Sequence, residues 1–218
     1  MRKHFPPVAL AFAALVASAC ANAQHGTYRQ PAPASAASVS TRDTTPTYTA
    51  ADIEFMNGMI AHHAQALLMA GWAESHGASP TIRTLTQRII NAQNDEIVGM
   101  QKWLRDRHQP VPEPNPRGMS MNMGGMQHQM LMPGMLTEDQ LKQLDAARSK
   151  DFDRLFLVFM IQHHQGAVTM VNNLFATNGA AQDITVYKMA SDISADQTTE
   201  IDRMQKMLAS MVFEAPTQ

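Results

Sequence analysis

Two stretches of the chain are closely alike: residues 52–69 read DIEFMNGMIAHHAQALLM, and residues 153–170 read DRLFLVFMIQHHQGAVTM. At an offset of 101 residues the same residue type recurs at eight positions, namely one Asp, one Phe, two Met, one Ile, two His and one Ala. Apolar residues return every three or four positions in both copies, which is the pattern of a helix with one buried face. The sequence therefore predicts two related helices, each with a pair of adjacent histidines.

A second helix is predicted after each copy, so the repeated unit is a helical hairpin. The first hairpin is expected to cover residues 49–108 and the second residues 150–212. Two hairpins with one apolar face each bury those faces best against each other. The predicted fold class is therefore all-α, with one four-helix bundle domain over residues 49–212. The positions shared by the second helices are Gln93, Glu96, Ile97, Met100 and Leu104, which recur at an offset of 104 as Gln197, Glu200, Ile201, Met204 and Leu208.

The segments outside the hairpins differ in composition. Residues 109–136 form a loop rich in Pro and Met, and a capping box then opens a short helix over residues 137–149. Residues 24–48 have no apolar period and are expected to be a disordered tether. Residues 1–23 have the basic start, apolar run and small-residue cleavage site of an export signal, so we expect a periplasmic or secreted protein. In the alternative, the chain is a lipoprotein anchored through Cys20.

The composition excludes several classes of partner and site. A net charge of −2 and a pI near 6.5 supply no basic surface for nucleic acid. No stretch after the signal is apolar enough over the length of a transmembrane helix. The single Cys permits neither a disulfide framework nor a thiolate metal site within the chain. In contrast, 18 of the 218 residues are Met, an unusually high share.

The paired histidines and the methionines near them are the first candidate metal site. Successive helical residues are about 100° apart, so two imidazoles and two thioethers of each copy share one sector of about 120°. Imidazole suits copper, zinc and nickel, whereas a thioether suits chiefly copper(I) or silver(I). The combination therefore points to copper, with silver(I) as an alternative. The candidate ligands are Met59, His62, His63 and Met69 in the first copy and Met160, His163, His164 and Met170 in the second.

The loop at residues 109–136 is a second candidate, because its methionines follow no helical period and helix packing does not explain them. We expect it to bind copper(I) or silver(I); in the alternative, the loop folds back and covers the bundle. Its candidate ligands are Met119, Met121, Met123, Met126, His128, Met130, Met132 and Met135.

Two further pairs, in the second helix of each hairpin, have two interpretations each. Glu96 and Glu200 either accept hydrogen bonds that orient the imidazoles or form a solvated edge. Met100 and Met204 either bind the metal or fill the core.

Three motifs together resemble domain-of-unknown-function family 305, which includes the CopM-like copper-binding proteins. They are Met132-Pro-Gly-Met-Leu136, Phe152-Asp-Arg-x-Phe156 and Met160-Ile-x-His-His-Gln-Gly-Ala167. The resemblance covers roughly residues 50–211 and implies a ferritin-like four-helix bundle, a location outside the cytoplasm and copper binding linked to metal resistance. The family's Met-x-x-His-His element corresponds to residues 160–164 and 59–63. The first copy departs from the second, with Ala64-Gln65 in place of Gln165-Gly166.

The leading hypothesis is a copper-binding protein that sequesters, buffers or hands on copper(I) or copper(II) in metal resistance or homeostasis. It needs no catalytic step, and a copper-delivery or efflux protein is a candidate partner. One alternative is an enzyme that oxidises or reduces copper, since mixed His and Met ligation serves both oxidation states. Another is a Met-rich module that binds proteins and no metal.

Overall fold

The computed structural model describes residues 47–123 and 126–213, all within one compact unit. The expected export signal at residues 1–23, Cys20 and nearly all of the expected tether at residues 24–48 lie outside the described residues. In the described part, no helix is both long and apolar enough to cross a membrane.

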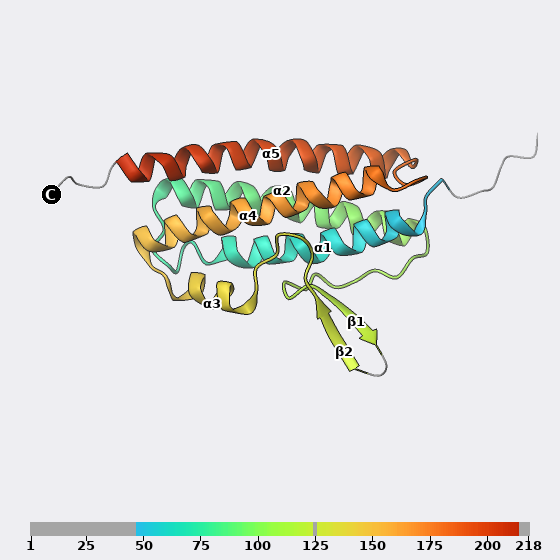
Figure 1. Ribbon diagram of the computed structural model, residues 1–218, viewed down its shortest axis with the longest axis horizontal. Helices are drawn as coiled ribbons and strands as arrows, with labels where there is room; N and C mark the ends of the chain where they lie inside the picture. Colours follow the sequence, from blue (N-terminus) through green and yellow to red (C-terminus); the bar gives the residue numbers. More distant parts are fainter. Residues whose placement is uncertain (1–46, 124–125, 214–218) are drawn as a thin grey trace, which may run out of the picture. The chain divides into compact units, whose positions relative to one another are not determined.

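Four long helices form the expected bundle (Figure 1). The first hairpin is α1 (Ala50–Gly71) and α2 (Pro80–Asp106), and the second is α4 (Ser149–Ala176) and α5 (Ile184–Phe213). Helices pack pairwise within each hairpin, and α1 packs against α4 across the bundle. The connecting segment holds a short helix, α3 (Glu138–Ala146), which ends three residues before the predicted boundary. The prediction of an all-α, four-helix bundle is thus confirmed for the body of the fold.

Local sequence explains where the helices begin. Thr49 and Asp52 form a capping box at the start of α1, with the Thr49 amide donating to Asp52 Oδ2 at 2.7 Å. Ser79 caps α2 with its hydroxyl, and Pro80 occupies the first turn, where its missing N–H costs nothing. These caps satisfy backbone donors that would otherwise be left without partners at the helix ends.

Each hairpin also contacts the bend of the other hairpin through a buried carboxylate. Asp52 Oδ1 accepts a hydrogen bond from the Ala181 amide at 2.7 Å, and Ala181 lies between α4 and α5. Asp153, the equivalent residue of the second copy, accepts from the amide of Ser79 between α1 and α2 at 3.2 Å. Since α1 therefore begins at the bend between α4 and α5, and α4 begins at the bend between α1 and α2, helices α1 and α4 run antiparallel.

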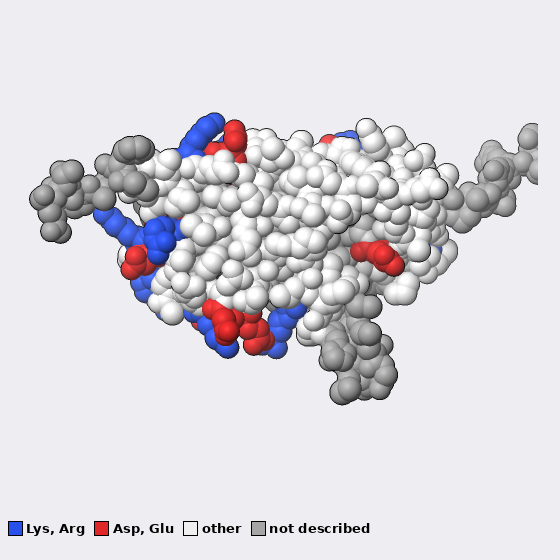
Figure 2. All heavy atoms as spheres, viewed as in Figure 1, with Lys and Arg blue, Asp and Glu red and all other residues white. Residues whose placement is uncertain are grey.

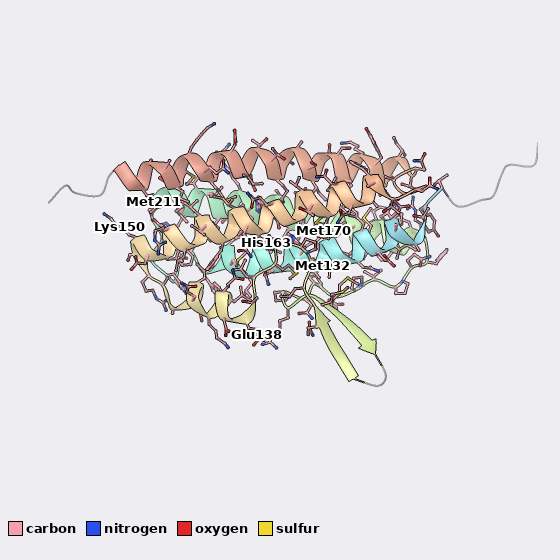
Figure 3. All side chains as sticks on the ribbon, in the orientation of Figure 1. Met132, Glu138, Lys150, His163, Met170 and Met211 are labelled. Carbon is pink, nitrogen blue, oxygen red and sulfur yellow. The ribbon has the colours of Figure 1, made fainter. Side chains whose placement is uncertain are left out.

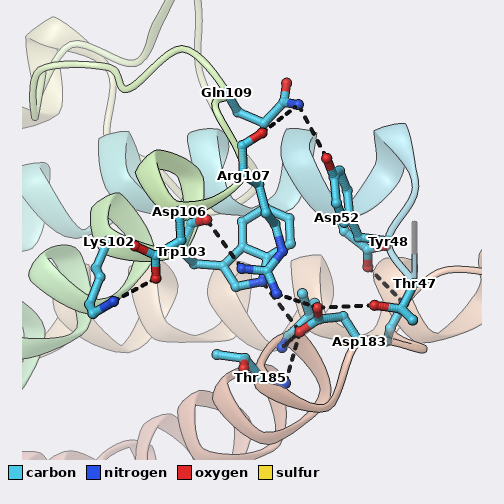
Figure 4. A network of polar contacts seen from close by, with 12 residues as sticks. Thr47, Tyr48, Asp52, Lys102, Trp103, Asp106, Arg107, Gln109, Asp183 and Thr185 are labelled. Atoms are coloured by element: carbon cyan, nitrogen blue, oxygen red, sulfur yellow. Dashed lines mark hydrogen bonds and ion pairs between the residues drawn. The ribbon is translucent and has the colours of Figure 1, made fainter. Parts of the chain in front are cut away.

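A second network closes the end of the bundle where α5 begins (Figure 4). Asp183 accepts hydrogen bonds from the amides of Thr185 and Val186, so it caps α5. Its carboxylate also pairs with Arg107, which stacks on the Trp103 ring 4.3 Å from the centroid. Burial raises the pKa of Asp183, but the hydrogen bonds from Arg107 and the helix amides outweigh it and lower the pKa below its ordinary value. The ionised carboxylate therefore joins the two hairpins.

The bundle interior contains two clusters of buried apolar residues. Along α1, residues 55–60 contribute to the first cluster and residues 66–73 to the second. Along α4 the order is reversed, with residues 152–160 in the second cluster and residues 167–174 in the first. The two His-His pairs lie between the clusters on both helices, so the fold places them at the middle of the bundle.

The expected Met-rich loop contains an element that was not predicted. Strands β1 (Met119–Met123) and β2 (Met126–Met130) pair antiparallel and project from the bundle (Figure 1). The register pairs Met119 with Met130, Met121 with His128 and Met123 with Met126, while Ser, Asn and Gln fill the positions between. The predicted Pro- and Met-rich loop thus includes two strands. The sequence of residues 119–130 alternates with a period of two around Gly124-Gly125, which is a hairpin signal.

Candidate metal centre

Four imidazoles lie in a row at the centre of the bundle, and all four side chains are completely buried. His62 of α1 stacks on His163 of α4 with ring centroids 3.8 Å apart. His63 lies beside His62, and His164 lies beside His163, at centroid distances of 6.3 Å in both cases. Figure 3 shows His163 in the middle of the bundle. The helical repeat thus brings both predicted histidine pairs together.

Three of the four rings donate one N–H to an oxygen that only accepts. His63 Nε2 donates to Glu96 Oε2 and His164 Nε2 donates to Glu200 Oε2, both at 2.7 Å. His62 Nε2 donates to the carbonyl oxygen of Pro133 at 3.0 Å. In a neutral imidazole the proton is then on Nε2, so Nδ1 carries the lone pair. This is the pattern by which carboxylates and carbonyls orient metal-binding histidines.

The other ring nitrogens of these histidines lack partners. Nδ1 of His62, His63 and His164 and both nitrogens of His163 are buried, and no described residue offers them a hydrogen bond of normal geometry. Buried polar atoms in folded proteins nearly always have a partner, so five such nitrogens in one place require an explanation. A bound metal ion supplies one, because it takes the place of a proton on an imidazole lone pair.

The environment favours the uncharged form of three of these rings, those of His62, His163 and His164. Burial, and after it the neighbouring imidazole of His63, lower the pKa of His62 from 6.5 to about 3. Burial and then the neighbouring rings lower the pKa of His163 well below its usual value. Burial also lowers the pKa of His164, although the hydrogen bond to Glu200 opposes this effect. Neutral imidazole is the form that binds metal, so protons do not compete for these sites near neutral pH.

The Met132-Pro-Gly-Met-Leu136 segment crosses α1 and α4 beside the histidines. Gln65 holds it from α1, donating to the carbonyl of Leu136 at 3.1 Å and accepting from the Leu136 amide at 2.6 Å. Gly166 holds it from α4 by close approach: a Cβ there would lie 1.9 Å from the carbonyl oxygen of Pro133. Gln65 and Gly166 are equivalent positions of the repeat. The two copies therefore differ there because each helix meets a different part of one segment.

The sequence allows two interpretations of Glu96 and Glu200, and both carboxylates accept from an imidazole while remaining partly exposed, at 18% and 21%. The buried methionines near them pack in the apolar clusters. Met59, Met100 and Met170 belong to the first cluster, and Met69, Met160 and Met204 belong to the second. Metal ligation by the thioethers of these clusters stays a prediction.

The candidate ligands between α2 and α3 differ in where the structure places them. Met119 and Met132 reach the bundle at Gly58, where they meet Met170 of α4. Met135 is buried, and its Sδ accepts a hydrogen bond from the Met132 amide at 3.3 Å, whereas Met130 is 44% exposed. The side chains of Met121, Met123, Met126 and His128 lie outside the described part of the structure, although their backbones belong to the two strands.

Among the described residues, no three His, Cys, Asp or Glu side chains are arranged as a ready metal site. The carboxylates of Glu96 and Glu200 are engaged with Nε2, so within the row only imidazole nitrogens are left without a partner. The donor set at the centre is thus nitrogen-only, with sulfur nearby. Such a set suits copper better than the harder ions that carboxylate sites select.

Sequence reasoning missed two residues that position the site, Pro133 and Gln65. The carbonyl of Pro133 fixes the His62 ring, yet the two residues are 71 positions apart in the chain. Gln65 occupies a place where the two copies of the repeat differ, and that difference was the available signal.

The match to a family model agrees with this fold and site. The family described as "Domain of unknown function (DUF305)" matches residues 52–208, which is more than half of the chain. The chain belongs to this family, as the three sequence motifs indicated.

Several solved structures are similar to this one. A DUF305 fragment from Deinococcus radiodurans has 28% sequence identity and a TM-score of 0.62, covering 76% of this chain and 99% of that chain. CopM in the Cu(I)-bound form has 29% identity and a TM-score of 0.55, covering 73% and 96%. CopM in the Cu(II)-bound form has 30% identity and a TM-score of 0.56, covering 73% and 97%.

A shorter similarity connects the chain to uncharacterized protein L153 of Acanthamoeba polyphaga mimivirus. The two are 38% identical over 56 residues, which is 26% of this chain. The match spans 37% of the length of that curated relative.

Proposed function

We propose that the protein binds copper outside the cytoplasm and sequesters, buffers or hands on the metal. The observation that carries the proposal is the row of four buried imidazoles with five unpartnered nitrogens, four of which belong to rings with a lowered pKa. Copper is the cargo here, and no catalytic step is required. The location rests on the export signal expected at residues 1–23.

The relatives support copper, with silver(I) as a further ion of the same kind. CopM is described in Cu(I)-bound, Cu(II)-bound and Ag-bound forms, and each is more than a quarter identical to this chain over most of its length. Imidazole nitrogen binds both oxidation states of copper, while thioether sulfur favours copper(I) and silver(I). The chain has one Cys and 18 Met, and methionine sulfur does not form disulfides. These sulfur atoms therefore stay available as ligands in an oxidising compartment.

The residues around the row have distinct roles in this proposal. The imidazoles of His62, His63, His163 and His164 provide the nitrogen ligands. The carboxylates of Glu96 and Glu200 and the carbonyl of Pro133 fix the tautomer and orientation of three rings and raise their basicity as ligands. The apolar clusters on both sides exclude water from the row.

His163 offers a sharp test, because its replacement removes no hydrogen bond of normal geometry. We expect His163→Leu to leave the metal-free protein at least as stable as the wild type, while weakening copper(I) and copper(II) binding at least tenfold. The measurement is titration with each ion against a competing chelator, combined with urea unfolding of the metal-free proteins. His108→Asn is the matched control, since His108 is exposed and has a positive φ that Asn tolerates.

Two results would contradict the proposal. If the wild type binds copper no more tightly than micromolar, the proposed copper-binding function is wrong. Tight copper binding that His163→Leu leaves unchanged would show that the histidine row is not the copper site.

A further inference from the structure

Three thioethers from three different segments converge on Gly58 of α1. A Cβ at this residue would lie 3.1 Å from Met132 Sδ, 3.7 Å from Met119 Sδ and 3.3 Å from Met170 Cε. Met119 begins β1, Met132 follows β2, and Met170 belongs to α4. Figure 3 shows Met132 and Met170 next to each other near the base of the β hairpin. The space that a side chain would occupy at residue 58 is therefore surrounded by sulfur-bearing groups.

The glycine itself calls for an explanation. Gly58 lies in the interior of α1, where glycine is less favourable than alanine, and its φ is not one that requires glycine. Gly71 of the same helix differs from Gly58, because a Cβ at Gly71 would meet no atom within 4 Å. The close sulfur groups are thus what distinguishes Gly58.

The internal repeat shows which residue occupies the equivalent position in the second copy. Gly58 corresponds to Phe159 in the second copy, and Met170 corresponds to Met69. Phe159 and Met69 belong to the same apolar cluster at the other end of the bundle. An aromatic ring therefore occupies the equivalent place in one half, while the other half leaves the place open and fills it with Met119 and Met132.

We propose that Met119, Met132 and Met170 form a thioether site for a soft monovalent cation, copper(I) or silver(I), and that Gly58 makes room for it. This inference rests on the proposed function and adds a second site to the histidine row. Thioethers are neutral and soft, so the site selects copper(I) and silver(I) over copper(II), and its occupancy does not depend on protonation of a ligand.

Two surface pockets are lined by methionines of this site. Met119 lines a pocket of about 370 Å³ together with Asn57 and Ala61. Met170 lines another of about 220 Å³ together with Glu54 and Pro133. On the face shown in Figure 2, Lys and Arg gather mainly toward the end of the bundle that carries α3 and the start of α4. A cation approaching the middle of this face therefore meets little positive charge.

Silver(I) is the probe of choice, because it needs no reductant and does not change its oxidation state during the experiment. We compare the wild type with the triple variant Met119→Leu, Met132→Leu and Met170→Leu by titration calorimetry. Leucine keeps the volume and apolar character of methionine, so the fold is retained, and circular dichroism verifies it. We expect the triple variant to bind one silver(I) fewer, with copper(II) binding at the histidine row unchanged.

A second variant tests Gly58 without removing any sulfur. Gly58→Ala places a methyl group within 3.3 Å of Met132 and Met170 and is expected to weaken the thioether site at least tenfold. Gly71→Ala is the matched control in the same helix and should leave silver(I) binding unchanged. X-ray absorption of the silver-loaded His163→Leu variant should still show sulfur in the first shell.

The outcomes separate this inference from the proposed function. If the wild type binds copper while the triple variant keeps the full silver(I) stoichiometry, the thioether site is wrong and the histidine row stands. If the triple variant binds one silver(I) fewer, while His163→Leu weakens copper(I) and copper(II) binding but keeps silver(I) with sulfur in its first shell, both sites are supported. If the wild type binds neither copper nor silver(I), both proposals fall together.

Discussion

His62 and His163 are equivalent residues of the two repeats, and their rings stack on each other with centroids 3.8 Å apart and planes inclined by 39°. The two copies of the repeat therefore contact each other through equivalent residues. The approximate twofold axis that relates the hairpins passes between the two rings. A proton on either ring would place a charge in a buried site directly against the other ring. The pair is consequently sensitive to pH in a way that exposed histidines are not.

The stability of the metal-free protein should fall as the pH decreases from about 7.5 to 5. The unfolded chain binds protons at its histidines near pH 6.5, whereas folded His62 does so only at about 3, and folded His163 and His164 also have lowered pKa values. The unfolded state then carries more protons, and each such histidine removes up to about 1.4 kcal/mol per pH unit. Urea unfolding at several pH values measures the slope.

His163→Leu is the control for this prediction, because it removes one of the three titrating rings. Its slope between about pH 6.5 and 5 should be shallower than that of the wild type. Equal slopes would show that other groups control the pH dependence.

Removing the carboxylate behind His164 should weaken copper(II) binding. Glu200→Ala takes away the acceptor of the Nε2 proton, so the ring loses its fixed orientation and part of its basicity. The expected loss is roughly 10- to 100-fold in affinity, with a smaller loss for Glu200→Gln, which keeps an acceptor oxygen. Chelator competition gives the affinities. Glu74→Ala, at an exposed position, should have no effect, and an unchanged affinity in Glu200→Ala would argue against this role.

Gly166→Ala should destabilise the bundle strongly. The new Cβ would lie 1.9 Å from the carbonyl oxygen of Pro133 and 2.6 Å from the Cα of Gly134, and backbone atoms cannot move aside as a flexible side chain can. We expect a loss of at least about 2 kcal/mol in the free energy of unfolding. Gly71→Ala, which meets nothing within 4 Å, should cost nothing. Thermal and urea unfolding compare the two, and similar stabilities would mean that the Pro133 segment does not pack on α4 as described.

Arg107→Ala should cost about 2 kcal/mol, because it deprives the buried Asp183 carboxylate of its charged partner. Lys102→Ala breaks the exposed pair with Asp106 on the same helix and should lower the free energy of unfolding far less, because exposed ion pairs contribute little. Chemical unfolding of both variants is the measurement. Equal effects would indicate that the network in Figure 4 contributes no more than a surface ion pair.

The bundle is predictable from the sequence because its evidence is local and repeated. Residues 52–69 and 153–170 each have a helical apolar period, and Thr49 and Ser79 supply caps at the starts of α1 and α2. The β hairpin was missed because Met is a good helix former and is not a typical strand residue. The period of two in residues 119–130 and the Gly-Gly pair were nevertheless present in the sequence.

The candidate site is predictable only in part. Helical spacing indicated that the histidine pairs share the inner face, and the structure buries all four rings. Spacing does not show that Pro133 fixes His62 or that Met119 and Met132 meet Met170, since these contacts depend on the path of a connection of more than thirty residues. The two copies of the repeat differ at Gly58 and Gly166, and these are positions where the segment between α2 and α3 contacts the bundle.

The exchange of contacts by Asp52 and Asp153 has a consequence for how the molecule unfolds. Each carboxylate completes the bend of the opposite hairpin, so neither half retains its full set of hydrogen bonds when the other is lost. The halves therefore have no separate melting transitions. A calorimetric scan should show one cooperative peak, with a van't Hoff enthalpy equal to the calorimetric enthalpy, whichever half carries a weakening substitution.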